Sequence, residues 1–214
     1  MVLRSALLAI ACLCAAAAAR QRGQLLTFDA DRAGVLPAGF TLAAMRQDSP
    51  GAWMVRRDGS NGMLAHLADP NASGFALALA VTATDREAAA VRLRLSGGTL
   101  AGGLVWRYVD PENFHATVLD LARRELVLFR VTGGNRVFLE SKDDLELDPR
   151  AWHTLKVTHD DEDIQVSLGG IRVFEERERR NDRRAGGLGR TGVIAAGGAE
   201  VWFDDLRVEP ARNR

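Results

Sequence analysis

Apolar and polar residues alternate along most of the chain from residue 75 onward, in short runs separated by glycine, asparagine or acidic turns. In residues 89–97, Val91, Leu93 and Leu95 alternate with arginines, which is the period of a strand with one buried face. After residue 20, no segment combines a long helical period with caps at both ends. The pattern therefore predicts short strands. Their expected ranges are 75–84, 89–97, 104–110, 113–121, 125–131, 136–141, 151–160, 163–170, 171–176, 191–196 and 200–210.

The connections between these runs predict antiparallel pairing. Residues 122–124 and 132–135 are short enough for hairpin turns, so we expect residues 113–141 to form a three-stranded meander. The part before residue 75 is less regular, and residues 23–31 are the expected first strand. Many short strands at regular spacing are typical of an all-β fold, here an antiparallel two-sheet β-sandwich of the jelly-roll type.

The N-terminal residues 1–20 have the pattern of a secretory signal peptide. Arg4 gives a positive start, residues 5–14 are apolar, and the alanines of residues 15–19 offer small-residue cleavage sites. The apolar run is shorter than the roughly 20 residues that span a membrane, and no later segment approaches that length. We expect cleavage to leave residues 21–214 as a single domain, secreted or periplasmic. A retained N-terminal anchor is the alternative.

Composition excludes several kinds of chemistry. Cys12 and Cys14 lie inside the expected signal peptide, so the mature chain would have no disulfide, catalytic thiol or zinc-thiolate site. The 28 basic and 28 acidic residues balance, which disfavours nucleic acid as a partner. Residues 175–184 mix both charges, and we expect them to form an exposed loop.

Several segments together carry a family resemblance. The order of four segments resembles that in the concanavalin A-like, laminin G-like jelly rolls of bacterial secreted proteins. These segments are residues 28–40, 101–120 (AGGLVWRYVDPENFHATVLD), 152–155 (WHTL) and 203–208 (FDDLRV). More narrowly, the chain is similar to the 3-keto-disaccharide hydrolase domain family. The resemblance implies a sandwich of two curved sheets, with roles that range from glycan binding to glycoside cleavage.

The carboxylates of known glucanases on this fold are absent. Laminarinase-like enzymes carry Glu-x-Asp-x-x-Glu on one strand, which places carboxylates in the same cleft. Residues 146–148 and 162–166 come nearest to this motif, and neither completes it. No catalytic residue is therefore identified, and the expectation leans away from an enzyme.

One polar set extends from the end of a predicted strand across a turn into the next strand. Antiparallel pairing would bring Arg107 near His115 or Thr117, giving donors, acceptors and ring surface for a sugar. In an enzyme, His115 or Asp110 would be the candidate general base. The alternative is a polar outer face with an Asp-Pro turn and an asparagine cap. The candidate ligand-binding residues are Arg107, Tyr108, Asp110, Asn113 and His115.

The first and last strands raise a second candidate site. In jelly rolls these strands often lie close together, so residues 27–31 can meet residues 202–206, with Phe28 and Phe203 in the core. Alternation then places Asp205 on the same side as Phe203. Its carboxylate would need a partner, which is either main-chain N–H groups of a loop, an arginine, or a hard cation such as a structural calcium ion. The expected calcium ligands are Asp29, Asp31 and Asp205.

The leading functional hypothesis is a secreted carbohydrate-associated binding module of the bacterial envelope, with a carbohydrate or glycoconjugate as its partner. The resemblance implies an alternative, a glycoside hydrolase of the 3-keto-disaccharide type. A third alternative is a laminin G-like module that binds a protein partner.

Overall fold

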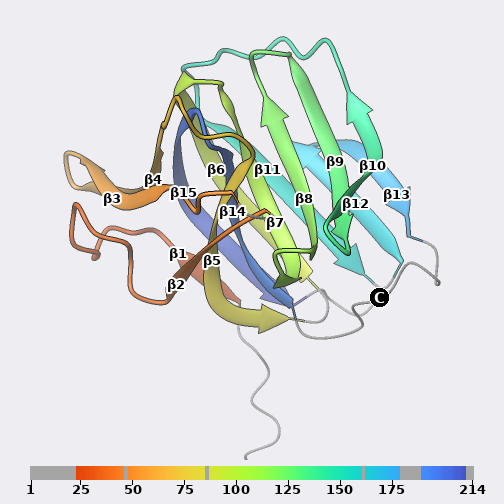
Figure 1. The fold of residues 1–214 in the computed structure, drawn as a ribbon, viewed down its shortest axis with the longest axis horizontal. Helices are drawn as coiled ribbons and strands as arrows, with labels where there is room; N and C mark the ends of the chain where they lie inside the picture. Colours follow the sequence, from red (N-terminus) through yellow and green to blue (C-terminus); the bar gives the residue numbers. More distant parts are fainter. Residues whose placement is uncertain (1–22, 46–47, 85–86, 161, 179–188, 211–214) are drawn as a thin grey trace, which may run out of the picture.

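The computed structural model describes residues 23–45, 48–84, 87–160, 162–178 and 189–210. The expected signal peptide therefore lies outside the described residues. Every regular element in the described part is a strand, as Figure 1 shows. No helix in these ranges is long and apolar enough to cross a membrane.

The strands form two antiparallel sheets, which confirms the predicted all-β sandwich. In spatial order, the eight-stranded sheet contains β13 (Ile171–Arg177), β12 (Asp163–Leu168), β11 (His153–Asp160), β6 (Glu87–Gly98), β15 (Ala199–Pro210), β4 (Asn61–Leu67) and β3 (Ala52–Asp58), and β1 (Gln24–Leu26) pairs with β15. The seven-stranded sheet contains β10 (Asn135–Lys142), β9 (Glu125–Thr132), β8 (Asn113–Asp120), β7 (Ala101–Asp110), β14 (Gly189–Ala196), β5 (Phe75–Thr84) and β2 (Phe40–Ala44). The expected meander is β8, β9 and β10.

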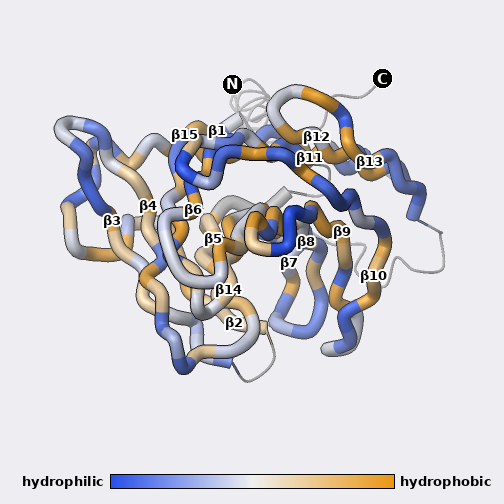
Figure 2. The backbone as a smooth tube through the Cα atoms, turned by 90° about the horizontal axis from the view of Figure 1, so that it is seen from above, coloured by the Kyte–Doolittle hydropathy of each residue, from blue (hydrophilic) through white to orange (hydrophobic). Residues whose placement is uncertain are grey.

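The main core lies between the two sheets. On β6, Val91, Leu93 and Leu95 are buried in this core, whereas Arg92 and Arg94 lie on the outer face of the sheet, as the alternation predicts. Burying one such aliphatic side chain contributes roughly 1.5 to 3 kcal/mol, so the repeated pattern fixes which face of each strand turns inward. Figure 2, seen from above, shows β11 and β12 in one layer and β7 to β10 in the other.

The seven-stranded sheet is buried on both faces. Along β8, Leu119 packs in the main core, while Phe114, Ala116 and Val118 lie on the opposite face and are at most 4% exposed. Strands of this kind read as continuous apolar runs, which explains sequences such as FALALA at the start of β5. We call the second group the outer apolar cluster; its buried members are Leu77, Leu79, Ala101, Val105, Tyr108, Phe114, Ala116, Val118, Phe129, Val131 and Ile194.

The first and last strands pair, as the sequence predicts. β1 lies antiparallel to β15, with Leu26 opposite Leu206, and Phe28 and Phe203 are both buried. The strand itself is shorter than the expected 23–31, because the chain turns away after Leu26 to pack Phe28 against Phe40, with ring centres 5.8 Å apart.

The predicted inward position of Asp205 is wrong. β15 has a register shift against β6 between Asp204 and Arg207, and Asp205 has a positive φ of 50°. A bulge inserts a residue and breaks the alternation of sides on which the prediction depended. Asp204 is consequently the buried carboxylate, at 3% exposure, and Asp205 instead pairs with Arg92 on the outer face of the sheet.

Candidate functional site: an outer groove and a buried charge cluster

A groove of about 410 Å³ hollows the outer face of the seven-stranded sheet. Its floor belongs to the outer apolar cluster, with Val118 and Phe129 among its lining residues. Phe75 adds a half-buried ring, whose centre lies 5.9 Å from that of Phe129. The other lining residues come from the loops before β5, β7, β9 and β15, from the end of β8, the start of β9 and the end of β14, and from β10: they include Ala72, Ser73, Thr99, Asp120, Arg123, Glu125, Arg136 and Gly197.

Charged side chains stand around this apolar floor. Arg123 closes a turn after β8, because its main-chain nitrogen donates to Asp120 Oδ1 at 3.0 Å. The guanidinium of Arg123 lies 3.4 Å from Asp120 Oδ2 and 3.9 Å from Glu125 Oε1. Arg136 lies over Phe129, with its guanidinium carbon 5.4 Å from the ring centre. The groove thus combines aromatic surface with several hydrogen-bond donors and acceptors.

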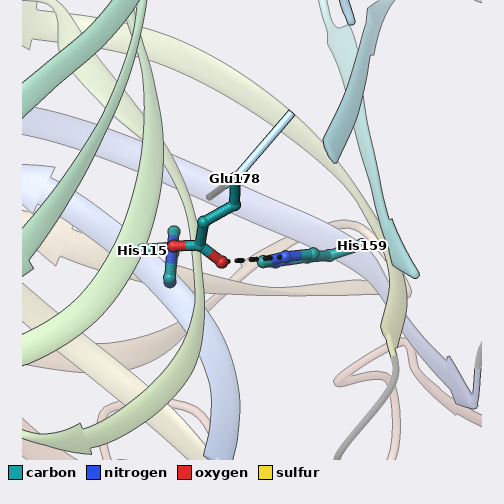
Figure 3. A group of neighbouring side chains, drawn as sticks. All are labelled: His115, His159 and Glu178. Atoms are coloured by element: carbon teal, nitrogen blue, oxygen red, sulfur yellow. Dashed lines mark hydrogen bonds and ion pairs between the residues drawn. The ribbon is translucent and has the colours of Figure 1, made fainter. Parts of the chain in front are cut away.

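A second polar group lies inside the sandwich, around the carboxylate of Glu178. His115 on β8 has its Nε2 2.9 Å from Glu178 Oε1, and His159 on β11 has its Nε2 3.4 Å from Oε2 (Figure 3). Glu178 follows β13 directly, and its main-chain nitrogen donates to the oxygen of Glu162 at 2.7 Å. Because β8 and β11 belong to different sheets, this one carboxylate connects both layers.

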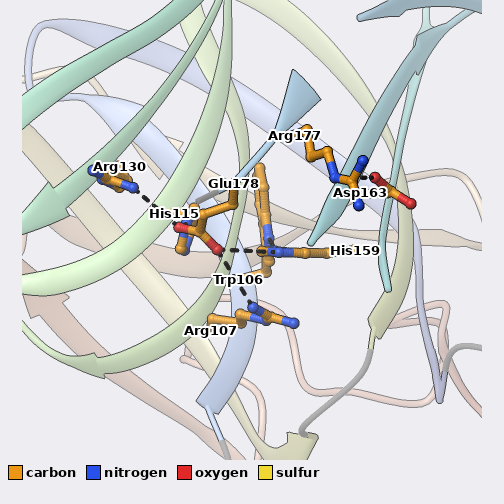
Figure 4. A network of polar contacts seen from close by, with 8 residues as sticks. All are labelled: Trp106, Arg107, His115, Arg130, His159, Asp163, Arg177 and Glu178. Carbon is orange, nitrogen blue, oxygen red and sulfur yellow. Dashed lines mark hydrogen bonds and ion pairs between the residues drawn. The ribbon is translucent and has the colours of Figure 1, made fainter. Parts of the chain in front are cut away.

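Two arginines approach the same carboxylate from the seven-stranded sheet. Arg130 Nη1 lies 3.3 Å from Oε1, and Arg107 Nη1 lies 3.7 Å from Oε2 (Figure 4). Both arginine side chains are 13% exposed, so these ion pairs are largely removed from water. We call Arg107, His115, Arg130, His159 and Glu178 the buried charge cluster.

The hydrogen bonds define the protonation of the cluster. Trp106 Nε1 donates to His159 Nδ1 at 3.1 Å, and an indole can act only as a donor. Neutral His159 therefore carries its proton on Nε2, which faces Glu178. Burial lowers the pKa of His159 to about 4, although the carboxylate of Glu178 acts in the opposite direction.

Glu178 is held in its ionised form. Burial alone would raise the pKa of this carboxyl group, but the hydrogen bonds from His115 and His159 outweigh burial and hold the pKa well below its usual range. At neutral pH the cluster therefore contains an ionised carboxylate beside a neutral His159.

The cluster has the residue types of a metal centre but not the arrangement. His115, His159 and Glu178 are the one group of three potential ligands in the described ranges, with ligand atoms within 4.8 Å of one another. However, His115 Nε2 and Glu178 already contact each other directly, and two arginines lie beside the same oxygens. A cation would be repelled by these guanidinium groups, so the geometry fits an ion-pair cluster better than a metal site.

The structure separates the five ligand-binding residues predicted from the sequence. Arg107 and His115 do come together, but they do so inside the sandwich, through Glu178. Tyr108 faces the opposite way, into the outer apolar cluster, where its ring packs against Phe114 and lies under Arg190. Burial raises its pKa.

Asp110 and Asn113 form the turn between β7 and β8. Asp110 Oδ1 accepts hydrogen bonds from the main-chain nitrogen of Glu112 at 2.7 Å and from Asn113 Nδ2 at 2.9 Å. This is the turn-and-cap alternative that the sequence left open.

Sequence reasoning missed the residue at the centre of the cluster. Glu178 belongs to the mixed-charge run 175–184, which was expected to be an exposed loop; it directly follows β13, which ends one residue beyond the expected strand 171–176, and it is only 5% exposed. His159 and Arg130 were missed as well. Their positions could have been inferred from the alternation of side chains in a strand. Successive residues along β11 and β9 face opposite sides of the sheet, and His159 and Arg130 fall on the inward side.

The proposed calcium ligands each have protein partners. Arg57 Nη2 donates to the main-chain oxygens of Asp29 and Asp31, at 2.9 and 2.7 Å, and Asp29 Oδ1 accepts from the nitrogen of Gly62 at 2.8 Å. Asp205 pairs with Arg92 at 3.0 Å. Calcium binding by Asp29, Asp31 and Asp205 stays a prediction.

Comparisons with known proteins agree on the fold. No protein-family model matches the chain, and no curated protein sequence matches it either. Among solved structures, it is similar to the carbohydrate binding module CBM66 from Bacillus subtilis, at 15% identity and a TM-score of 0.64 over 80% of this chain and 95% of that one. It is also similar to a Bacillus licheniformis β-glucanase, at 11% identity and a TM-score of 0.61 over 89% and 99% of the two chains. A Bacillus subtilis protein of unknown function with a galectin-like fold matches at 13% identity and a TM-score of 0.57, over 82% and 90%. The chain therefore has the concanavalin A-like jelly-roll fold of these proteins.

Proposed function

We propose that this protein is a secreted carbohydrate-binding module whose ligand occupies the outer groove. The observation that carries the proposal is the groove itself: its floor contains Phe75 and Phe129, and charged side chains stand at its edge. Sugars present apolar ring faces and many hydroxyl groups, which fit aromatic surface flanked by polar groups. The signal-like residues 1–20 support secretion. A carbohydrate binding module and a glucanase among the structural neighbours also support a carbohydrate ligand.

The outer face of the eight-stranded sheet is a weaker candidate for sugar stacking. It carries Trp152 and Trp202, but the guanidinium of Arg94 lies over both rings, 5.3 and 4.4 Å from their centres. Arg92 also lies over Trp152, at 5.1 Å. These cation–π contacts occupy ring surface that a sugar would need.

Filling the groove tests the proposal. Ser73 is exposed and lines the groove, so Ser73→Trp would place an indole in the space of the ligand without removing a buried group. We expect glycan binding, measured by glycan array and then by calorimetry, to fall by about tenfold or more. Ser60→Trp, at an exposed turn of the other sheet, is the matched control and should bind as the wild type does. Equal binding by both variants would refute the groove as the site.

A glycoside hydrolase of the 3-keto-disaccharide type is the second candidate, and the buried charge cluster favours it because it combines two histidines with a carboxylate. Against it, glycoside cleavage commonly needs two carboxylates, and the cluster supplies one whose two oxygens already have partners. Product analysis with a 3-keto-disaccharide distinguishes the hydrolase from the binding module: turnover that is lost in Glu178→Gln while the variant stays folded would favour the hydrolase.

The laminin G-like alternative rests on the sequence resemblance alone.

A further inference from the structure

The edge strand β10 places two side chains beside the outer groove. In the register with β9, Arg136 lies opposite Val131 and Phe138 lies opposite Phe129. Residues directly opposite each other in antiparallel strands share a face, and Val131 and Phe129 belong to the outer apolar cluster. Arg136 and Phe138 therefore lie on the same outer face as the groove.

Arg136 differs from the other charges of the groove. Asp120 and Glu125 both lie within 4 Å of the Arg123 guanidinium, so this one cation is already shared by two carboxylates and the three residues keep a net negative charge. Arg136 is exposed, contacts the ring of Phe129, and forms no ion pair with any residue of the described ranges. A guanidinium that lies over a ring keeps N–H donors at its edge, in a geometry that matches a carboxylate or a sulfate.

Phe138 supplies an exposed aromatic ring beside the groove, in addition to the guanidinium of Arg136. It is 61% exposed, while the other phenylalanines of the described sheets are buried or half-buried. An exposed aromatic ring next to a groove suits stacking against the apolar face of a sugar ring. Because Phe138 lies outside the groove lining but beside Phe129, it extends the surface over the edge strand.

We propose that the groove binds an anionic oligosaccharide, in which a carboxylate or sulfate group pairs with Arg136 while a neighbouring sugar ring stacks on Phe138. This inference rests on the proposed carbohydrate-binding function and goes further by naming the ligand class. The anionic group comes either from a uronic acid or from a sulfate ester, since both present oxygens that accept paired N–H donors.

Two pairs of matched ligands test the proposal by calorimetry with the full-length protein. The first pair is tetragalacturonic acid and its methyl ester, which share a sugar skeleton and differ in charge. The second pair is a sulfated galactan tetrasaccharide and its unsulfated form. We expect at least one anionic member to bind about tenfold more tightly than its neutral counterpart, and the pair that does so identifies the anionic group.

Substitutions assign the effect to the two residues. Arg136→Gln keeps an amide donor but removes the charge, so it should weaken binding of the anionic ligand by about tenfold and leave the neutral one unchanged. Phe138→Ala should weaken both ligands. Arg56→Gln on β3, an exposed arginine of the other sheet, is the control and should change neither. Melting temperatures close to that of the wild type would show that all variants are folded.

The outcomes separate this inference from the function on which it rests. If glycans bind but the neutral members bind as tightly as the charged ones, or if Arg136→Gln weakens both equally, the anionic preference is wrong and carbohydrate binding stands. If none of the four ligands binds while the glycan array gives a hit with another sugar, the anionic inference alone fails; if nothing binds in either experiment, both proposals fail.

Discussion

At the scale of single residues, Glu178 gathers buried charge from both sheets in the described part of the protein. Four side chains from both sheets converge on its carboxylate, which is 3% exposed. Buried ion pairs of this kind contribute little net stability compared with apolar packing, but removing one partner leaves the other buried charges less well compensated. We therefore expect the protein to lose stability when Glu178 is replaced, even by a residue of the same shape.

Glu178→Gln should lower the free energy of unfolding by about 3 kcal/mol, because Arg107 and Arg130 would lose an ionised partner in a site with little water. Urea unfolding monitored by tryptophan fluorescence measures the change. Glu175→Gln is the control: its side chain is 59% exposed and pairs with Arg172, so its effect should stay within about 0.5 kcal/mol. Equal stability of the two variants would mean that the cluster does not depend on the charge.

The pH dependence of stability follows from His159. Its pKa is about 4 in the folded protein, against a usual value near 6.5, so below pH 6.5 the unfolded chain takes up a proton that the folded protein does not. Stability should fall by about 2 kcal/mol between pH 7 and pH 5 from this residue alone. Burial also lowers the pKa of His66, which acts in the same direction. Glu178, whose pKa is depressed, adds to this loss only when the pH approaches 4.5, the usual pKa of a glutamate in the unfolded chain, and its contribution grows as the pH falls further.

Comparing unfolding at pH 7 and pH 5 for the wild type and His159→Gln tests this assignment. The variant should be less stable at pH 7, since the hydrogen bond from Trp106 and the packing are disturbed. It should nevertheless lose less stability on acidification than the wild type does. The same loss in both proteins would assign the acid sensitivity to other groups.

At the scale of elements, the close approach of neighbouring strands limits the side chains of the seven-stranded sheet. A Cβ at Gly103 on β7 would collide with the main-chain oxygen of Thr117 on β8. Gly103→Ala should therefore force the two strands apart and lower the free energy of unfolding by about 2 kcal/mol. At Gly97 on β6, the nearest atom to an added Cβ would be Glu200 Cβ at 3.8 Å, so Gly97→Ala should be nearly neutral. Thermal unfolding of the two variants measures the difference, and similar melting temperatures would contradict the steric argument.

The strands could largely be predicted from the sequence, whereas the bulges could not. The range 75–84 coincides with β5, because its apolar run ends at clear turn signals. Arg107 and Asp205 instead have positive φ values of 48° and 50°, at register shifts in β7 and β15. Alternation assumes a regular strand, so it fails beyond an inserted residue. For this reason, the side toward which Asp205 points was wrongly predicted.

At the scale of the whole molecule, the sandwich followed from local pattern, but the candidate sites depend on contacts between distant segments. Glu178 contacts His115 across 63 positions of sequence, and no local period encodes that distance. The groove likewise combines loops before β5, β7 and β9. The alternation along β9 places Val127 and Phe129 on the outer face of the sheet, so the apolar floor of the groove could have been predicted from the sequence. The space above this floor depends on the loops that surround it.

The pairing of β1 with β15 determines how the protein can be presented to a ligand. The described chain enters and leaves through neighbouring strands of the eight-stranded sheet, with Gln24 opposite Val208, and the groove lies on the outer face of the other sheet. A biosensor chip that captures the protein through residues before Gln24 or after Val208 holds it by the layer opposite the groove. Immobilisation at either end should therefore leave the same face open to glycans in solution.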